Sequence, residues 1–350
     1  MKVEMINMEK KTGKRSLPFY LFTLLLFLVA CSTTKKSQVA QPVVTVTFNA
    51  DSAYEFCAAQ CSFGPRTMNS EAHEQCAQWI QQKFEQYGYQ VTLQKADLKG
   101  YDGTILKSTN IIACHQPSAI SHQPSSRIFI CAHWDSRPWA DNDPDEANWR
   151  KPVMAANDGA SGVAVMLELA RLLQQNDSAR VAVDFICFDA EDWGVPQWSD
   201  IADADSWALG AQYWAANYRS EANGQKPNAK SYQYGILLDM VGGQGAKFYQ
   251  EQMSNIYASA IVKKVWRAAR QAGYGSFFPK KEGGGITDDH IPINQLAKIP
   301  TIDIIAYYPD CSQSSFGPTW HTLADDMQHI DRNTLKAVGQ TVIQVLWTEK

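Results

Sequence analysis

The feature that most constrains this fold is a series of short, almost continuous apolar runs that alternate with longer amphipathic segments. The runs read as buried strands and are RIFICA (127–132), VAVDFICF (181–188), YGILLDMV (234–241) and IPTIDIIAY (299–307). Two further runs, 91–95 and 110–114, are expected to pair at an edge. Helical patterns cover 70–87, 162–175, 205–218, 254–272 and 332–348. Apolar strands without polar alternation are buried on both faces, so the pattern predicts a three-layer α/β/α fold with a mixed, mostly parallel central sheet.

The first 30 residues have the pattern of a targeting signal. A basic region at 10–15 precedes an apolar run at 17–30 that is too short for an ordinary membrane span. The run ends in Leu28-Val29-Ala30-Cys31, and small residues before a cysteine at this point resemble a bacterial lipobox. The resemblance implies cleavage before Cys31 and lipidation of that cysteine, which anchors stably only with more than one chain. An ordinary cleaved signal peptide, with Cys31 incidental, is the alternative.

The signal divides the chain into three predicted parts. These are a lipoprotein signal peptide at 1–30, the lipidated cysteine with a flexible polar tether at 31–45, and a single catalytic α/β domain at 46–350. We expect the protein in the bacterial cell envelope, anchored in a membrane by lipid on Cys31 and facing the periplasm. The net charge of −4 argues against nucleic acid as a partner. A monomer is expected, because no heptad or apolar interface stripe is evident.

Seven cysteines follow Cys31, so at least one thiol is unpaired by disulfides within the domain. Cys131 and Cys187 lie inside apolar strand-like runs and are expected in the core. Cys57 and Cys61 are four residues apart and are either paired or free. The absence of a CxxC repeat argues against a zinc site built from cysteines.

Polar groups follow the predicted central strands where packing does not explain them. They are His133 after the first run, Glu191 and Asp192 after the second, Asp239 within the third, Asp158 before the helix at 162, and His321 after the last strand. Singly, each has an ordinary structural explanation, such as a helix N-cap, a loop histidine or a solvated charge pair. In open α/β sheets, however, sites lie beyond the carboxyl ends of the strands. Carboxylates and imidazoles converging there form a mixed oxygen and nitrogen site that suits zinc.

Other catalytic motifs are missing from the sequence. The serine run at 159–162 lacks the G-x-S-x-G spacing of a nucleophile elbow, and no G-x-G-x-x-G motif follows a strand. The glycines at 283–285 read as a loop rather than as a phosphate cradle. Metal-dependent chemistry therefore explains the strand-end residues better than a serine nucleophile or a dinucleotide cofactor.

Six ordered motifs resemble zinc aminopeptidase family M28, and more specifically its glutaminyl-peptide cyclotransferase branch. They are AHWDSR (132–137), NDGASGVAVMLELAR (157–171), FDAEDWG (188–194), LLDM (237–240), DDHIP (288–292) and WHT (320–322). The resemblance spans roughly 70–345. It implies the zinc aminopeptidase-like form of the α/β fold.

In the aminopeptidases of this family, the resemblance implies two zinc ions and Glu191 as the general base. The five ligand positions correspond to His133, Asp158, Asp192, Asp239 and His321. In the cyclases, one zinc is bound at the positions of Asp158, Asp192 and His321, while the other two residues are retained. The ligand inventory therefore does not separate one zinc per chain from two.

Three features favour the cyclase. Asp288 precedes Asp289-His290, Trp320 precedes His321, and tryptophans follow the acidic pair at 193, 198 and 207. The resemblance implies that Trp198, Trp207 and Trp320 bind substrate. It also implies that Asp239 binds the substrate α-amine and that Asp288 stabilises developing charge. One departure is Asp192, because animal cyclases have glutamate there.

The sequence thus predicts an acyltransferase that cyclises N-terminal glutaminyl residues of peptides and proteins to pyroglutamate and releases ammonia, using zinc. Its partners would be peptide or protein N-termini that bear glutamine. The alternative is an M28-type di-zinc aminopeptidase that releases N-terminal amino acids, with His133 and Asp239 as ligands of a second metal. A degenerate fold that serves only for binding is disfavoured by the intact Glu191 and the complete ligand set.

Overall fold

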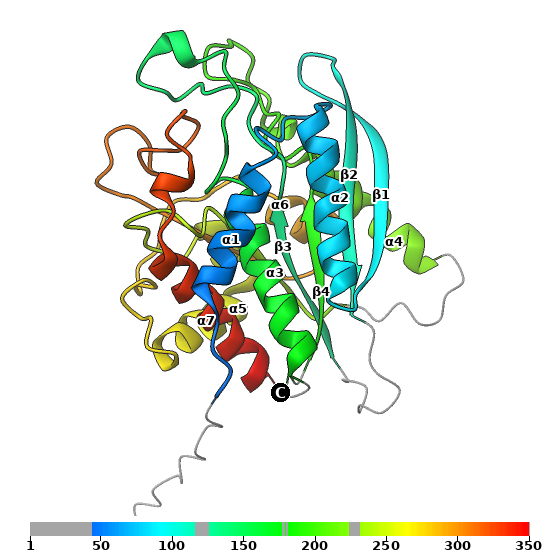
Figure 1. The fold of residues 1–350 in the computed structure, drawn as a ribbon, viewed down its shortest axis with the longest axis vertical. Helices are drawn as coiled ribbons and strands as arrows, with labels where there is room; N and C mark the ends of the chain where they lie inside the picture. The colour runs from blue at the N-terminus through cyan, green and yellow to red at the C-terminus, as the bar shows by residue number, and fades with distance from the viewer. Residues whose placement is uncertain (1–43, 116–125, 177–178, 180, 224–231, 350) are drawn as a thin grey trace, which may run out of the picture. The chain divides into compact units, whose positions relative to one another are not determined.

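The computed structural model describes residues 44–115, 126–176, 179, 181–223 and 232–349. All of them belong to one compact unit, Pro42–Lys350 (Figure 1). The predicted signal peptide, Cys31 and most of the predicted tether lie outside the described residues. The three-part division of the chain therefore stays a prediction. Within the described part of the chain, no helix combines the length and apolar character that crossing a bilayer requires.

A six-stranded mixed sheet forms the centre of this unit. Its order is β1 (Gln90–Lys99), β2 (Ile105–Cys114), β4 (Ala182–Phe188), β3 (Arg127–His133), β5 (Gly235–Asp239) and β6 (Thr301–Ile305). Strands β4, β3, β5 and β6 are parallel to their neighbours in that series, whereas β1–β2 and β2–β4 are antiparallel. The mixed sheet and its edge pair were predicted and are confirmed.

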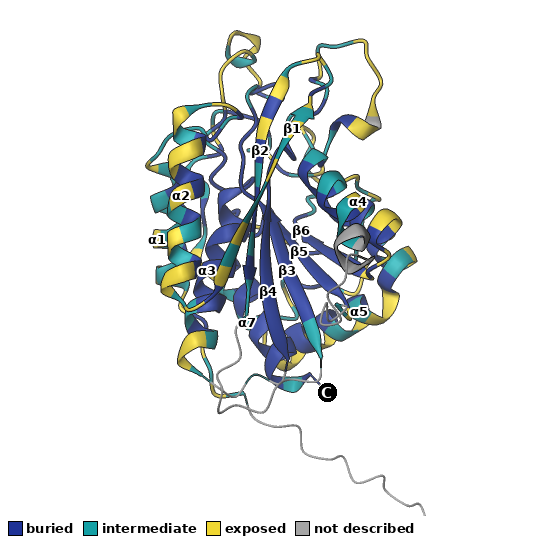
Figure 2. Cartoon of the chain, turned by 90° about the vertical axis from the view of Figure 1, so that its right-hand side faces the viewer, coloured by how far each residue is buried: buried dark blue, intermediate teal, exposed yellow. Residues whose placement is uncertain are grey.

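Helices cover both faces of the sheet, which gives the three predicted layers (Figures 1 and 2). One face packs against α1 (Ala50–Cys61), α2 (Glu71–Gln86), α3 (Ala160–Gln175) and α7 (Arg332–Thr348), and α5 (Gln252–Gln271) contacts both α7 and β6. The other face packs against α4 (Leu209–Asn223) and the short helices α6 (His290–Pro292) and η3 (Ile293–Ala297). Along β3, Ile128 and Ile130 face the first core, whereas Phe129 and Cys131 face the second, as the two-residue strand period requires.

Several predicted elements differ from the structure in extent. The edge strands extend to 90–99 and 105–114, because β1 has only exposed and half-buried residues and the first half of β2 alternates between exposed and buried ones, so neither part contains an apolar run. Helix α4 begins at Leu209 rather than at 205, since η2 (Ala204–Ser206) is a separate turn and Ala208 has φ 55°. Helix α1, capped by the Asn49 side chain, was not predicted because its amphipathic pattern is weak.

The seven cysteines of the described chain are all free thiols. Cys131 and Cys187 are fully buried in the core, as predicted. Cys57 and Cys61 are therefore not paired with each other, which is one of the two states that the sequence left open.

Buried Arg66 ties together two loops that lead to the strand-end residues. Its guanidinium donates to the carbonyl oxygens of Trp134 (3.1 Å), Met154 (2.8 Å) and Ala155 (2.7 Å), and the residue is 0% exposed. These carbonyls follow β3 and precede α3, so a single side chain fixes the separation of the two loops. The buried Trp134 carbonyl would otherwise have no donor, which costs about 1–3 kcal/mol, whereas the Ala155 carbonyl also accepts from the Ala160 N–H at 3.3 Å.

We expect Arg66→Leu to lower the free energy of unfolding by at least about 3 kcal/mol, because three carbonyl oxygens lose a hydrogen bond from a charged donor. Urea unfolding followed by far-UV circular dichroism measures this loss. Lys107→Met is the matched control, since Lys107 is exposed and its ion pair with Asp97 is worth at most about 1 kcal/mol. Equal stabilities of the two variants would contradict the account.

Candidate active site

The strand-end residues meet at the carboxyl edge of the parallel strands. His133 ends β3 and Asp239 ends β5, while Glu191 and Asp192 lie in the loop that follows β4. Asp158 precedes α3, and His321 lies in the long loop between β6 and α7; each of these six residues is at most 8% exposed. The convergence expected from the parallel topology is thus present.

Asp158, Asp192 and His321 form the first donor set. One ligand atom of each lies within 4.8 Å of the others. His321 Nε2 is 3.3 Å from Asp192 Oδ1 and 3.5 Å from Asp158 Oδ2. Asp192 Oδ2 is buried and has no hydrogen-bond partner. Two carboxylates and one imidazole with an unsatisfied oxygen fit a zinc ion, which prefers such ligands in three-residue catalytic sites.

A second donor set lies beside the first and shares Asp158 with it. His133 Nε2 is 3.0 Å from Asp158 Oδ1 and 3.3 Å from Asp239 Oδ1. The three residues also place one ligand atom each within 4.8 Å of one another. All five predicted ligand positions are therefore brought together, in two overlapping groups.

His321 is oriented by residues for which the sequence suggested no role. Its Nδ1 lies 3.3 Å from Asp141 Oδ1, and Arg137 donates to Asp141 at 2.7 and 3.0 Å. Burial opposes the ionisation of Asp141, but the hydrogen bonds from His321 and Arg137 still hold its pKa below the ordinary value. Arg137 also donates to the carbonyl of Asp192 at 3.1 Å. A carboxylate behind a ligand histidine fixes the ring and increases its basicity.

Two more buried carboxylates position the backbone of the site. Asp135 accepts from the N–H groups of Glu191 (3.1 Å) and Asp192 (3.2 Å). Asp325 accepts from the N–H groups of Asn157 (2.7 Å) and Asp158 (3.0 Å). No sequence pattern indicated Asp325, whereas Asp135 lies in the HWD segment next to a predicted ligand.

Gly159 permits the turn between Asp158 and α3. Its φ is +108°, and a Cβ at this position would lie 2.6 Å from the carbonyl oxygen of Asp135. Gly159 is the N-cap residue of α3 and no side chain caps that helix, so Asp158 does not serve as the cap. Its carboxylate instead faces both histidines.

A cavity of about 260 Å³ opens onto the donor sets. Its acidic side includes Asp158, Glu191, Asp239 and Asp288, and its other walls include Met240, Ile286, Ile305, Phe316, Trp207 and Trp320. The Trp320 ring stacks on His321 with centroids 3.7 Å apart, and the Trp207 ring lies nearly parallel to His321 at 6.0 Å. Two of the three predicted substrate-binding tryptophans therefore line the cavity next to the ligand histidine.

The third predicted tryptophan, Trp198, does not line this cavity. Its ring stacks with Trp149 at 6.2 Å, packs edge-on against Trp139 at 5.9 Å, and is covered by the Arg150 guanidinium at 3.9 Å. The long loop after Asp192 places this ring in a separate aromatic cluster with Trp139 and Trp149. The geometry therefore gives no support for direct contact between Trp198 and a substrate in the cavity.

Glu191 has the environment of a proton-transfer group. Burial raises its pKa well above the ordinary value; neighbouring His133 opposes this rise and Asp192 adds to it. The side chain lines the cavity and is 8% exposed. A carboxyl group with a raised pKa beside a metal site suits general acid–base catalysis.

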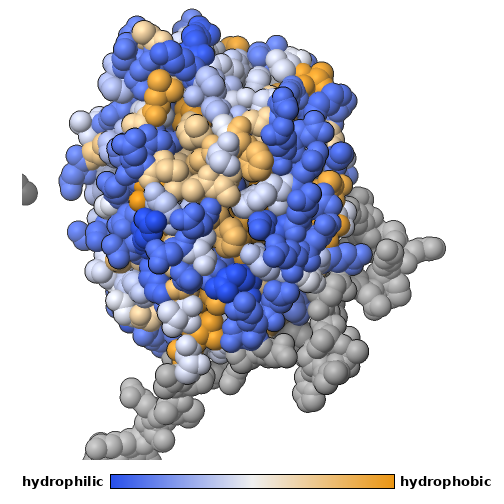
Figure 3. Space-filling model, viewed as in Figure 1, coloured by the Kyte–Doolittle hydropathy of each residue, from blue (hydrophilic) through white to orange (hydrophobic). Residues whose placement is uncertain are grey.

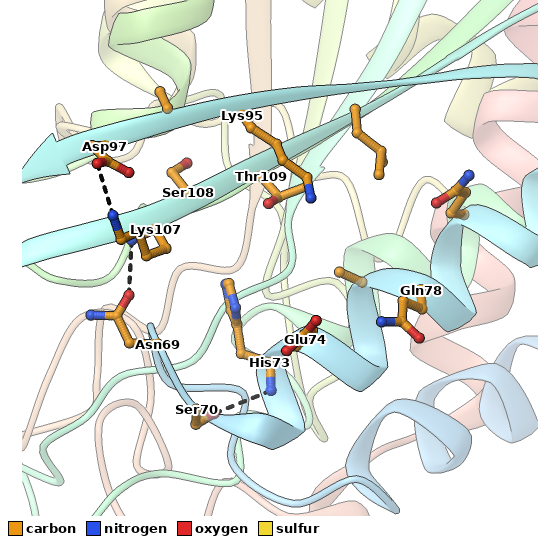
Figure 4. A pocket seen from close by; sticks show the side chains of 14 residues that line it. Asn69, Ser70, His73, Glu74, Gln78, Lys95, Asp97, Lys107, Ser108 and Thr109 are labelled. Atoms are coloured by element: carbon orange, nitrogen blue, oxygen red, sulfur yellow. Dashed lines mark hydrogen bonds and ion pairs between the residues drawn. The ribbon is translucent and has the colours of Figure 1, made fainter.

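A second cavity, of about 440 Å³, lies between α2 and the β1–β2 hairpin (Figure 4). The exposed pair Asp97–Lys107 spans one side of it, and Asn69 accepts from the Lys107 backbone N–H. His73 borders this cavity, but its Nε2 is already hydrogen-bonded to Asp189 at 2.8 Å. Neither donor set reaches it, so the smaller cavity is the candidate active site.

Comparison with known proteins agrees with this site. Residues 110–346 match Peptidase family M28. The chain belongs to peptidase family M28. Among solved structures, a Bacteroides thetaiotaomicron glutaminyl cyclase bound to N-acetylhistamine is 47% identical with a TM-score of 0.80, covering 87% of this chain and 99% of that one. A Zn-dependent exopeptidase from Parabacteroides distasonis is 45% identical with a TM-score of 0.80, covering 88% and 100%.

Curated relatives carry both names, and a glutaminyl-peptide cyclotransferase of Dictyostelium discoideum is 27% identical over 240 residues, which cover 63% of this chain and 59% of that protein. Aminopeptidase YwaD of Bacillus subtilis is 28% identical over 267 residues, which cover 74% of this chain and 49% of that protein. The chain spans about half to two thirds of the length of the curated relatives it matches. The predicted fold and the predicted resemblance to glutaminyl cyclases of this family are confirmed, and the predicted use of zinc is supported.

We expect alanine at Asp158, Asp192 or His321 to abolish zinc binding. Loss of a direct ligand should exceed the roughly 10- to 100-fold drop in affinity that follows loss of a ligand's hydrogen-bonding partner. The metal content of each purified variant is measured by mass spectrometry after dialysis. Glu191→Gln is the matched control and should retain zinc. Zinc loss in Glu191→Gln, with retention in Asp192→Ala, would reverse the roles of these neighbours.

Proposed function

We propose that this protein is a zinc-dependent glutaminyl cyclase that converts N-terminal glutaminyl residues of peptides and proteins to pyroglutamate and releases ammonia. The observation that carries the proposal is the composition of the cavity. Asp288 joins Glu191 and Asp239 on its acidic side, while Trp207 and Trp320 flank His321. A volume of about 260 Å³ suits one folded N-terminal residue better than a length of extended peptide.

The reaction needs no nucleophile from the protein. The substrate α-amine forms a bond to the carbon of its own side-chain amide, and the bond from that carbon to the amide nitrogen breaks. Asp158, Asp192 and His321 would hold one zinc, which supplies Lewis-acid polarisation of the amide carbonyl. Glu191 takes a proton from the attacking amine and returns one to the leaving nitrogen, which departs as ammonia.

The cavity also favours the geometry of ring closure. Aromatic walls on both sides of His321 restrict the side chain to a folded shape in which the amine lies close to the amide carbon. Burial raises the pKa of Asp239 to about 7; the hydrogen bond with His133 opposes the shift and Asp288 adds to it. Asp239 would accept a hydrogen bond from the substrate amine, and Asp288 would stabilise charge that develops on the reacting groups.

We propose one zinc per chain because the cyclisation needs a single Lewis acid to polarise the amide carbonyl. In the second donor set, His133 is hydrogen-bonded to Asp158 and lies close to Asp239. The di-zinc aminopeptidase remains the second candidate, because Asp158 is shared by both donor sets as in a bridged two-metal site. In that reaction Glu191 would activate a water molecule instead of the substrate amine.

We propose further that the protein acts as a monomer in the bacterial cell envelope, facing the periplasm and held to a membrane by lipid on Cys31. The lipobox-like end of the N-terminal apolar run supports this proposal. Proteins that acquire an N-terminal glutamine on signal cleavage are then within reach. Nucleic acid is not expected as a partner of this acidic chain.

The test is incubation of the zinc-loaded protein with a Gln-initiated peptide and, separately, with an aminoacyl chromogenic amide. We expect a pyroglutamyl peptide and free ammonia from the first and no release of chromophore from the second. Glu191→Gln should lower kcat by about 10²- to 10⁴-fold while retaining zinc. Release of free N-terminal residues without pyroglutamate would establish the aminopeptidase instead.

A further inference from the structure

A buried acidic layer lies directly behind the cavity. Asp303 is in the middle of β6, Asp288 and Asp289 precede α6, and Glu251 caps α5. These carboxylates are at most 3% exposed, and His290 among them is fully buried. Of the four, only Asp288 lines the cavity. Asp303 therefore does not touch a substrate but lies one layer deeper.

Asp303 and Asp288 have complementary unsatisfied atoms. Neither carboxylate oxygen of Asp303 has a hydrogen-bond partner, and Asp288 Oδ2 also has none. Asp288 Oδ1 accepts from the backbone N–H of Asp289. One oxygen each of Asp288 and Asp303, with one ring nitrogen of His290, lie within 4.8 Å of one another. Two ionised carboxylates so placed, with three of their four oxygens lacking a donor, would cost several kcal/mol.

The His290 imidazole also contacts a third carboxylate, that of Glu251. Its Nε2 lies 3.2 Å from Glu251 Oε2. Glu251 also accepts from the backbone N–H groups of Met253 (2.7 Å) and Ile286 (3.1 Å), which holds it as a carboxylate. Burial opposes ionisation of Glu251, but the His290 contact lowers its pKa. A proton shared between Asp288 and Asp303 is then the simplest neutralisation of the remaining charge.

We propose that Asp303 is a positioning residue whose protonated carboxyl group donates a hydrogen bond to Asp288 and keeps Asp288 ionised and directed into the cavity. The inference rests on the proposed cyclase function. Burial, and next the charge of Asp288, raise the pKa of Asp303 well above the ordinary value. Burial also raises the pKa of Asp288, but His290 and the hydrogen bonds from the Asp289 N–H and from Asp303 oppose this rise. The proton therefore belongs to Asp303.

This arrangement explains how an apolar strand carries an aspartate. Asp303 pairs in register with Leu237 of β5, in a strand whose other residues are also buried. Its backbone N–H donates to Ser254 Oγ at 2.9 Å, which fixes the strand against the start of α5. A charged group there would be costly, whereas a neutral acid that donates to Asp288 is satisfied.

The test compares Asp303→Asn with Asp303→Leu, which have similar shapes but differ in the ability to donate. We expect Asp303→Asn to keep kcat within about threefold of the wild type for a Gln-initiated peptide. Asp303→Leu should lower kcat at least 10-fold with KM changed less than threefold, because Asp288 then loses its donor and its ionised form. Both variants should retain zinc and a cooperative thermal transition. Equal kcat values for the two variants would overturn the proposal.

Infrared spectroscopy gives a readout that does not depend on activity. The wild type should show a carbonyl stretching band of a buried protonated carboxyl group, sensitive to D₂O, that loses intensity in Asp303→Asn. An unchanged band would overturn the proposal, as would a metal ion beyond the zinc that is lost on Asp303→Asn. A wild type that forms no pyroglutamate but shows the band would refute the cyclase function while leaving the shared proton intact.

Discussion

The structure depends on negative charge that converges at one edge of the sheet. Four carboxylates and one imidazole line the same small cavity, Asp192 and His133 lie beside them, and none of these residues is more than 8% exposed. Buried carboxylates are tolerated only when protons, cations or hydrogen-bond donors compensate them. The site uses all three, with zinc proposed at Asp158, Asp192 and His321, and protons on the deeper acids. The surrounding fold supplies the donors.

Those donors come mostly from backbone and from two buried arginines. Asp135 and Asp325 accept backbone N–H groups of the loops that carry the predicted ligands, while Arg66 and Arg137 cross-link the same loops through carbonyl oxygens. The backbone is strained where these loops turn, because Ala190, Met240 and His321 have positive φ values. Such conformations persist only when the packing around them is rigid. The strained loops therefore lower the stability of the fold but hold the proposed ligands in a fixed arrangement.

Much of the fold and of the site could be predicted from the sequence, and there are physical reasons why the remaining features could not. Polar residues at the ends of apolar runs predicted the site, because parallel strands bring their carboxyl ends together whatever the loops do. The surroundings of Trp198 could not be predicted, because the path of the long loop after Asp192 has no periodic sequence pattern. Asp135 and Asp325 act through backbone N–H groups, which have no sequence pattern. Asp303 did leave a signal, a single acid within an apolar strand, but its partner Asp288 is distant along the chain.

The most direct test of the account is a crystal structure of the full-length protein with anomalous data on both sides of the zinc absorption edge. The account predicts one fully occupied zinc per chain, with Asp158, Asp192 and His321 as its protein ligands and Glu191 outside the coordination sphere. Two zinc peaks bridged by Asp158, with His133 and Asp239 as ligands, would contradict the single-zinc cyclase and establish the aminopeptidase arrangement.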